Sequence, residues 1–285
     1  MRLYDLPCKG DQSKIKAEEP LMTAISALAQ GSHVLLIVDE RDRLRGLITA
    51  PRILSLLSAL TLNSKLLNYP VSLFVDERAV TMHYEYPIEA ALQLMAEEGR
   101  SHLVIVDGLK AMDLLTHRCL LRLILGPKSS DLRLDLRKLA SKDIPTLLTY
   151  SSLAEALKIM KEVGYYEAPI LEEDVIGIVR LRDVISEVIG GGKLRLIKAF
   201  SKSKLISHGV RSFSEAIELA LKEDINLLPV LKDDGSYGFV KLEDLFVQLI
   251  REYGAFKISE IIKLNLRSHQ QEGSWKVMVP RVTSR

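Results

Sequence analysis

The sequence is poor in cysteine, and this argues against sites built from thiols. Only two cysteines, Cys8 and Cys119, occur in 285 residues, and they lie far apart without the C-x-x-C spacing of a zinc site. We therefore expect neither a metal site nor a disulfide framework. Cys119 stands at the start of an apolar helical stretch, so we expect it to be a buried free thiol.

Long hydrophobic runs and a strong net charge are missing as well. No run approaches the roughly 18 apolar residues that span a membrane, and the first residues, Met1–Asp5, lack the apolar core of a signal peptide. The formal net charge of +2 gives no general reason to expect nucleic acid as a partner. With 47% hydrophobic and 27% charged residues, the chain has the composition of a globular protein, which we expect in the cytoplasm and away from membranes.

Sequence signatures of common enzymes are also absent. The chain contains no G-x-S-x-G, no Walker lysine loop, no dinucleotide G-x-G-x-x-G and no H-E-x-x-H. The triple glycine Gly190–Gly192 precedes Lys193, but neither the glycine spacing nor the preceding segment fits a phosphate loop. We interpret it as a linker and do not expect an enzyme.

The sequence does contain one unit that is repeated four times. Residues 144–189 predict a strand at 144–148, a helix that begins with the capping box Ser152-Leu-Ala-Glu155 and ends at Gly164, a hairpin of 168–171 with 175–179, and a second helix from near Asp183. The central alanines of the first helices, Ala24, Ala91, Ala156 and Ala216, lie 67, 65 and 60 residues apart. A period of this length indicates tandem repeats.

The other copies keep the same helix face and the same hairpin. The apolar positions i, i+3, i+4 and i+7 are Leu21, Ala24, Ile25 and Leu28 in the first copy, Ile88, Ala91, Leu92 and Met95 in the second, Leu153, Ala156, Leu157 and Met160 in the third, and Phe213, Ala216, Ile217 and Ala220 in the fourth. The hairpins are predicted at 34–38 with 44–49, 103–106 with 109–116, and 227–231 with 237–241. We therefore expect an α/β (α+β) fold of four β-α-β-β-α repeats with small sheets flanked by helices.

The repeated unit resembles the CBS domain, named after cystathionine β-synthase. The matching residues are the Ser-Leu-x-Glu-Ala helix start, the Ala-Pro-Ile and Leu-Pro-Val strands, and the endings Gly177–Asp183 and Gly238–Asp244. The resemblance covers roughly residues 10–250. It implies two Bateman modules, each a pair of repeats, as in the γ subunit of AMP-activated kinase, with adenosyl ligands in the clefts of each pair.

The repeats predict the following domain organisation. The expected boundaries are 10–61, 69–125, 132–191 and 196–250 for CBS repeats 1 to 4, with 251–285 as a C-terminal extension, and the break between modules falls at 126–131. Residues 1–14 form a polar leader that could supply the opening strand of repeat 1. In the extension, 258–266 could be a short helix, 269–274 reads as a loop, and 275–279 could add a strand to the chain or dock on a partner.

The resemblance also implies which residues would bind a ligand. In the family, the Asp of a Ser/Thr-x-x-Asp sequence accepts hydrogen bonds from both ribose hydroxyls, and Asp183 and Asp244 occupy that position here. The residues alone leave open that each Asp only caps its helix. Arg180 and Lys241 replace the family's Ser or Thr, and could either meet a phosphate or fill the cleft.

The strands that lead into the first helices supply the remaining site residues. In repeat 3 this residue is Thr146, six residues before the helix start at Ser152. The equivalent residues of repeat 4 are Ile206 and Ser207, although β-branched residues are also ordinary in strands. The expected site comprises Asp183, Asp244, Arg180, Lys241, Thr146, Ile206, Ser207 and the strand prolines Pro169 and Pro229. Thr146 and Asp244 would serve one cleft, and Ile206 and Asp183 the other.

The first module departs from the family pattern. Repeat 1 keeps Thr49 but has Arg52 in the position of the Asp, and repeat 2 keeps Thr116 but has Cys119 there. Neither replacement accepts ribose hydroxyls well, so we expect this module to be the poorer site. His33, Arg100 and His102 precede second strands, where they could reach phosphates or simply belong to polar loops.

These features together predict a cytoplasmic regulatory sensor of adenine nucleotides that takes part in energy sensing. AMP is the favoured ligand, with ADP, ATP or S-adenosylmethionine as alternatives, and binding would change the behaviour of an unidentified protein partner. A homodimer is left open. The rival interpretation is a protein-interaction scaffold with empty clefts.

Overall fold

A computed structural model describes residues 1–8, 13–62, 64–76, 79–126, 129, 131–173 and 175–272. The expected strand or docking segment at 275–279 lies outside these residues. Across the described part of the chain, no helix is long and apolar enough to cross a membrane.

The first two repeats have the predicted order of elements. Repeat 1 consists of β1 (Ser13–Lys16), α1 (Leu21–Ala29), β2 (Val34–Val38), β3 (Leu44–Thr49) and α2 (Ala50–Leu62). The short 3-10 helices η2 (Ser64–Asn68) and η3 (Val71–Phe74) connect it to repeat 2. Repeat 2 consists of β4 (Thr81–His83), α3 (Ile88–Glu97), β5 (His102–Asp107), β6 (Lys110–Thr116) and α4 (His117–Ile124).

The second half repeats this order with one exception. After α5 (Leu136–Leu139), repeat 3 consists of α6 (Leu153–Val163), β7 (Glu167–Glu172), β8 (Val175–Arg180) and α7 (Leu181–Ile189). The expected strand at 144–148 is reduced to a single parallel bridge between Leu147 and Ile170, because Pro145 lacks a backbone N–H for a ladder. After η5 (Ala199–Lys202), repeat 4 consists of β9 (Lys204–Ile206), α8 (Phe213–Glu223), β10 (Leu227–Leu231), β11 (Tyr237–Lys241) and α9 (Leu242–Tyr253).

Local sequence signals set the ends of the helices. The capping box of α6 forms as predicted, because Glu155 N donates to Ser152 Oγ at 3.3 Å and Ser152 N donates to the Glu155 carboxylate at 2.7 Å. Gly164 ends this helix with φ of 65°, a left-handed conformation that glycine adopts without strain. These signals explain why the same helix begins and ends at matching points of the repeat.

The strands join repeat 1 to repeat 2 and repeat 3 to repeat 4. The sheets have the orders β1-β2-β3, β4-β5-β6, β7-β8-β9 and β10-β11. The segment that leads into one repeat pairs with the last strand of the other: Asp76 bridges Leu47 of β3, β9 pairs with β8, and Ser141 bridges Phe239 of β11. The four repeats therefore form two modules in sequence order, as predicted.

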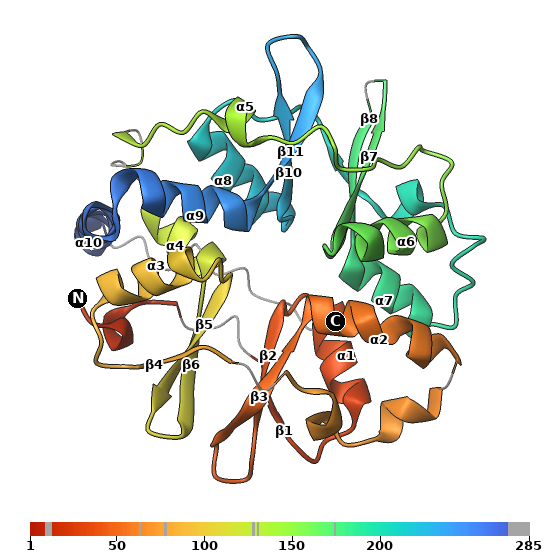
Figure 1. Ribbon diagram of the computed structural model, residues 1–285, viewed down its shortest axis with the longest axis horizontal. Coiled ribbons are helices and arrows are strands. Elements are labelled where there is room, and N and C mark those ends of the chain that lie inside the picture. Colours follow the sequence, from red (N-terminus) through yellow and green to blue (C-terminus); the bar gives the residue numbers. More distant parts are fainter. Residues whose placement is uncertain are drawn as a thin grey trace.

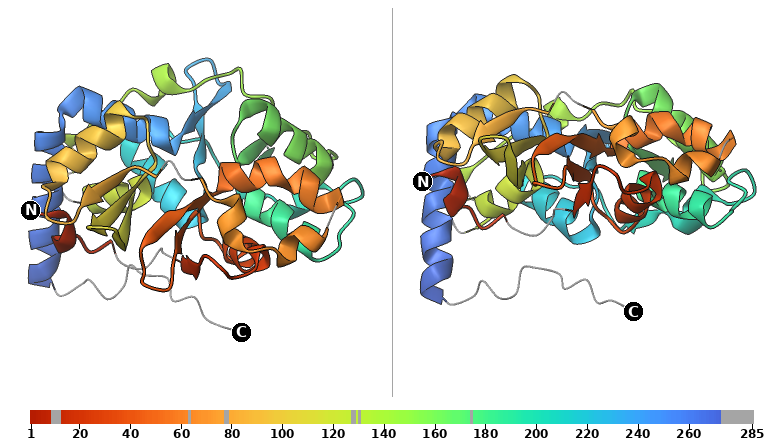
Figure 2. Two further views of the ribbon diagram at one scale, coloured as in Figure 1. Left: turned by 60° about the horizontal axis from the view of Figure 1, so that its bottom comes forward. Right: turned by 90° about the horizontal axis from the view of Figure 1, so that it is seen from below.

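Helices join one module to the other. α1 packs against α7, and α3 against α9, so repeat 1 lies beside repeat 3 and repeat 2 beside repeat 4 around a common centre (Figure 1). Two large apolar cores follow this division, one in repeats 2 and 4 and one in repeats 1 and 3, and a smaller core lies between the sheets of repeats 1 and 2. The result is a disc that is visibly thinner when seen from below (Figure 2).

The N-terminal segment and the last described helix both contact repeat 2. The N-terminal segment Met1–Cys8 contains the 3-10 helix η1 (Leu3–Asp5) and runs against the start of α3, whereas β1 opens repeat 1. The expected short helix at 258–266 is a longer one, α10 (Ala255–Glu272), which packs on α3 and α4. The prediction of a loop at 269–274 is therefore wrong for 269–272, because docking of the preceding turns on repeat 2 supports the helix.

Candidate functional site

Asp183 is bound by a cation of its own helix start. Arg180 is the N-cap of α7. Its Nε lies 2.8 Å from Oδ2 of Asp183, and its Nη2 lies 2.8 Å from Oδ1. The backbone N–H of Arg180 also donates to this carboxylate, at 3.3 Å. Both side chains are largely buried. In this structure Asp183 is a capping residue, and a ribose would have to compete with a bidentate ion pair.

Asp244, the equivalent residue of repeat 4, has different surroundings. It lies exposed in the first turn of α9. Lys241, the N-cap of α9, places its Nζ 4.7 Å from the centre of the Tyr165 ring in repeat 3 and so is directed to the other repeat. No hydrogen bond to the Asp244 carboxylate occurs among the described residues. This carboxylate is therefore accessible to a ligand.

The leading segments of repeats 3 and 4 do not match at the expected residues. Leu147 N donates to Pro169 O and Val210 N donates to Pro229 O, both at 2.8 Å. Thr146 therefore corresponds to Gly209, and the expected match with Ile206 and Ser207 is wrong. The reason is that the loop from this segment to the helix is three residues shorter in repeat 4, where β9 pairs with β8 instead.

The remaining predicted residues have these positions. Thr146 is exposed, whereas Ile206 is buried. Ser207 is exposed and its hydroxyl pairs with Nδ1 of His208 at 2.8 Å. Pro169 and Pro229 are buried in the strands β7 and β10. A Cβ at Gly209 would lie 2.6 Å from the Tyr237 ring, so the Asp183 cleft has no threonine hydroxyl at the position of Thr146.

Sequence reasoning missed a polar cluster at the centre of the molecule, which draws one residue from each repeat. Asp224, just after α8, pairs with Arg182 of α7, with Arg118 Nη2 of α4 at 3.0 Å, and with His33 Nε2, before β2, at 3.3 Å. We call His33, Arg118, Arg182 and Asp224 the four-repeat cluster. The hydrogen bond with His33 and the nearby charges of Arg118 and Arg182 hold the pKa of Asp224 far below its usual value although burial opposes this.

The four-repeat cluster uses cations that could otherwise meet phosphates. Arg118 is buried and also donates to the carbonyl oxygens of Ala220 and Ile225 at 2.9 Å. Of the histidine and arginine candidates from the sequence, His33 belongs to this cluster, whereas Arg100 is exposed and His102 pairs with Ser101. Burial lowers the pKa of His102 to about 4, so it is neutral near pH 7.

A second buried group ties repeat 3 to repeat 4 beside this cluster. Glu167, at the start of β7, accepts hydrogen bonds from the backbone N–H groups of Asn226 and Leu227 and from the Asn226 amide. Burial raises the pKa of Glu167 to about 7, against the effect of these donors. A hollow of about 30 Å³ beside Glu167, Arg180 and His33 can hold one or two waters but not a nucleotide.

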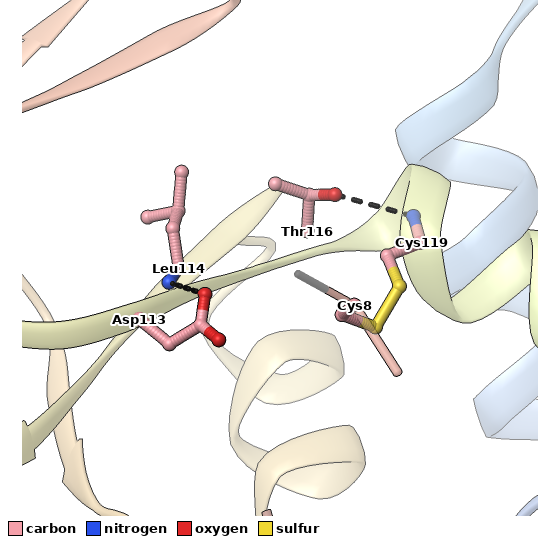
Figure 3. The surroundings of a disulfide bond; sticks show 5 residues. All are labelled: Cys8, Asp113, Leu114, Thr116 and Cys119. Atoms are coloured by element: carbon pink, nitrogen blue, oxygen red, sulfur yellow. Dashed lines mark hydrogen bonds between the residues drawn. A yellow bond between two sulfur atoms is a disulfide. The ribbon is translucent and has the colours of Figure 1, made fainter. Parts of the chain in front are cut away.

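The expected free thiol at Cys119 is wrong, because Cys119 forms a disulfide with Cys8 (Figure 3). The two Cα atoms lie 5.8 Å apart, within the usual range for a disulfide. Thr116 caps α4 by accepting a hydrogen bond from Cys119 N at 3.2 Å. In repeat 2, the position that the family's ribose-binding Asp would occupy is thus taken by a cysteine in a disulfide. In repeat 1 the same position holds Arg52, whose Nε donates to Phe74 O at 2.9 Å.

Comparisons with known proteins agree with this architecture. A model of the CBS domain family matches residues 136–190. An uncharacterised 33.4 kDa protein in the ribosomal RNA operon of Thermofilum pendens is 23% identical over 249 residues, which cover 78% of this chain and 82% of that protein.

Two solved structures share the fold. A protein from Methanocaldococcus jannaschii, a proposed archaeal homologue of γ-AMPK, has a TM-score of 0.70 at 16% identity, covering 86% of this chain and 99% of its own. An uncharacterised conserved protein from Pyrococcus horikoshii has a TM-score of 0.53 at 18% identity, covering 76% of this chain and 91% of its own. Residues 136–190 thus match the CBS domain family, and the fold of the chain, in which tandem repeats pair into two modules, is the fold of these two structures.

Proposed function

We propose that this protein is a regulatory sensor that binds one adenine nucleotide, AMP in preference to ADP, ATP or S-adenosylmethionine, in the cleft of Thr146 and Asp244. The observation that carries the proposal is the accessible carboxylate of Asp244. The equivalent positions hold Asp183 paired with Arg180, Cys119 in a disulfide, and Arg52 bound to a carbonyl. The proposed site is therefore one cleft out of four.

The chemistry of this cleft suits a nucleotide. A carboxylate is an acceptor only and can take two hydroxyl donors at once, as the ribose of AMP requires. The ammonium group of Lys241 stands three residues before Asp244 and would favour a phosphate over the sulfonium group of S-adenosylmethionine. The exposed Thr146 adds a hydroxyl from repeat 3.

Binding would regulate a partner by changing how the two repeats meet. Lys241 contacts Tyr165 across the repeat boundary, and a phosphate that attracted Lys241 would weaken this contact. Such a ligand shifts the arrangement of the repeats only as far as its affinities for the two arrangements differ. The partner and the output, including a role in energy sensing, belong to this proposal.

Calorimetric titration with AMP tests the site through a matched pair of variants. Hydrogen bonds to a charged group are worth roughly 1.5–3 kcal/mol, so Asp244→Asn should weaken AMP binding by roughly 10- to 100-fold. Asp183→Asn, at the equivalent position, should leave the affinity within about twofold of wild type. Unchanged affinity in a folded Asp244→Asn protein would contradict a role of Asp244 in AMP binding.

A scaffold with empty clefts is the second candidate, favoured by the closed positions at Arg52, Cys119 and Asp183. Thermal-shift measurements with AMP, ADP, ATP and S-adenosylmethionine distinguish the two. A ligand at 100 times its dissociation constant adds about 2.7 kcal/mol of stability, so the sensor should show a clear rise in Tm with AMP. No shift with any of the four compounds would support the scaffold.

A further inference from the structure

The N-terminal segment Met1–Cys8 lies along the entrance to repeat 2. Leu3 and Leu6 are 2% and 3% exposed in the apolar core around Ile88. Three backbone hydrogen bonds join the segment to the loop before α3 and to the first residue of this helix: Leu3 N to Tyr86 O at 3.0 Å, Tyr4 N to Tyr84 O at 3.3 Å, and Ile88 N to Met1 O at 3.2 Å. An exposed ion pair of Arg2 with Glu85 and a ring contact of Tyr4 with Tyr84 add to these contacts, and the disulfide lies at the end of the segment.

The disulfide fixes this segment at one particular place. Cys119 is the third residue of α4, where repeats 3 and 4 carry Asp183 and Asp244, and it is 5% exposed. Cys8 is only partly buried and lies 111 residues away in sequence. A covalent bond over such a separation restricts the chain strongly, while Cys8, the less buried of the two residues, gives a thiol reagent a point of attack.

We propose that the Cys8–Cys119 pair is a site of reversible oxidation that latches the N-terminal segment onto repeat 2. In the oxidised protein the segment is held across the start of α4. In the reduced protein the two leucines, the hydrogen bonds, the exposed Arg2–Glu85 ion pair and the Tyr4–Tyr84 ring contact hold it without a covalent bond, and the segment leaves repeat 2 often enough to expose Cys119. The latch needs no nucleotide, so it stands apart from the proposed function of the Asp244 cleft.

The reaction is an exchange with a dithiol, either a small molecule or a redox protein with two cysteines. One thiolate of the dithiol attacks Sγ of Cys8, the bond between the two sulfurs breaks, and Cys119 leaves as a thiolate and takes up a proton. The second thiol of the reagent then attacks the mixed disulfide and releases Cys8. Two electrons and two protons pass from the dithiol to the protein, and the dithiol becomes a disulfide.

Hydrogen exchange of the full-length protein with and without dithiothreitol tests the latch. Alkylation and mass spectrometry should first find both cysteines protected in the air-oxidised protein and both labelled after mild reduction without denaturant. The amides of Leu3 and Tyr4 should then exchange at least tenfold faster in the reduced protein. Amides of α9 in repeat 4 should keep their rates, and Cys8→Ser should match the reduced protein in both redox conditions.

Each other result overturns the proposal. Free thiols in the air-oxidised protein, or a bond that resists excess dithiothreitol in the folded state, would remove the reversible site. Unchanged exchange at Leu3 and Tyr4 after reduction would mean that the non-covalent contacts hold the segment without the disulfide. Faster exchange in α9 as well would show a structural crosslink whose loss loosens the whole molecule.

Discussion

At the scale of single residues, the difference between Arg180 and Lys241 decides which aspartate is accessible. The planar guanidinium group of Arg180 matches both oxygens of Asp183. The ammonium group of Lys241 cannot make such a fork and is directed to Tyr165 instead. The two sequences Arg-x-x-Asp and Lys-x-x-Asp are alike in charge, and yet the carboxylate of Asp183 is paired whereas that of Asp244 is accessible.

Lys241→Arg should therefore weaken AMP binding, because the new guanidinium group would capture Asp244 as Arg180 captures Asp183. An ion pair that costs about 1.4 kcal/mol to open lowers the affinity roughly tenfold, which calorimetry can measure. Lys241→Gln removes the cation without supplying a fork and should have a smaller effect. Equal affinities for AMP in wild type and Lys241→Arg would contradict the role of this residue pair.

His117 gives a second prediction, which concerns pH. Its Nδ1 lies 2.9 Å from Ser101 O, its Nε2 has no partner among the described residues, and burial lowers its pKa to about 3. The unfolded chain takes up a proton here below about pH 6.5 and the folded protein does not, so stability is lost as the pH falls. The loss is about 1.4 kcal/mol for each pH unit below 6.5.

Unfolding by urea at several pH values checks this contribution. His117→Asn keeps a donor near Ser101 O but cannot titrate, so its free energy of unfolding should fall less between pH 6.5 and 4.5 than that of wild type. His208→Asn replaces an exposed histidine and should follow the wild-type curve. A curve for His117→Asn parallel to wild type would show that His117 does not carry this pH dependence.

At the scale of elements, the buried side-chain amide of Asn265 joins α10 to the end of α4. The Nδ2 of Asn265 donates to Leu123 O at 3.2 Å and to Ile124 O at 2.9 Å, at the carboxyl end of α4. Asn265→Ala should lower the free energy of unfolding by about 1–3 kcal/mol, because both carbonyl groups are buried without this donor. Denaturation by urea measures the change, with Arg267→Ala on the exposed face of α10 as control; a loss under about 0.5 kcal/mol would contradict the assignment.

Elements whose signals are local could be predicted from the sequence, and contacts between distant residues could not. The capping box at Ser152, the stop at Gly164 and the hairpins depend on neighbours a few residues away. The disulfide joins residues 111 apart, and the shorter loop before α8 moves the counterpart of Thr146 to Gly209 without changing the helix phase. The end of α10 was predicted too early because contacts with α3 and α4, through Glu89 and Asn265, support it.

Asp224 illustrates why part of the site could not be predicted. The first helix of a repeat is followed by a glycine with positive φ at Gly99 and Gly164, and in repeat 4 by Asp224 with φ of 53°. Glycine would avoid the strain of this conformation, so the carboxylate must compensate for it. Nothing near Asp224 in the sequence indicates that its partners come from three other repeats.

At the scale of the whole molecule, the four-repeat cluster is where both modules meet. Sheets join repeats within a module and helices join the modules, so each repeat has a neighbour on two sides (Figure 1). Asp224 lies where these two kinds of contact converge and accepts Arg118 from repeat 2, Arg182 from repeat 3 and His33 from repeat 1. A change in this carboxylate should therefore affect both modules.

Asp224→Asn tests this, since asparagine also tolerates positive φ but leaves Arg118 buried without its anion. We expect a loss of about 3 kcal/mol in the free energy of unfolding, the lower end for breaking a buried ion pair, because 33% of the Asp224 side chain reaches solvent.

The pKa of Asp224 is depressed in the folded state, so its contribution to stability is complete above about pH 4 and is lost below it. The variant should therefore lack this part of the acid sensitivity. Asp233→Asn, at a surface pair with 83% of the aspartate side chain exposed, should change stability by less than about 0.5 kcal/mol. Urea denaturation at pH 7 and pH 3 measures the free energy of unfolding of each variant. If Asp224→Asn differs from wild type no more than Asp233→Asn does, the cluster does not hold the repeats together.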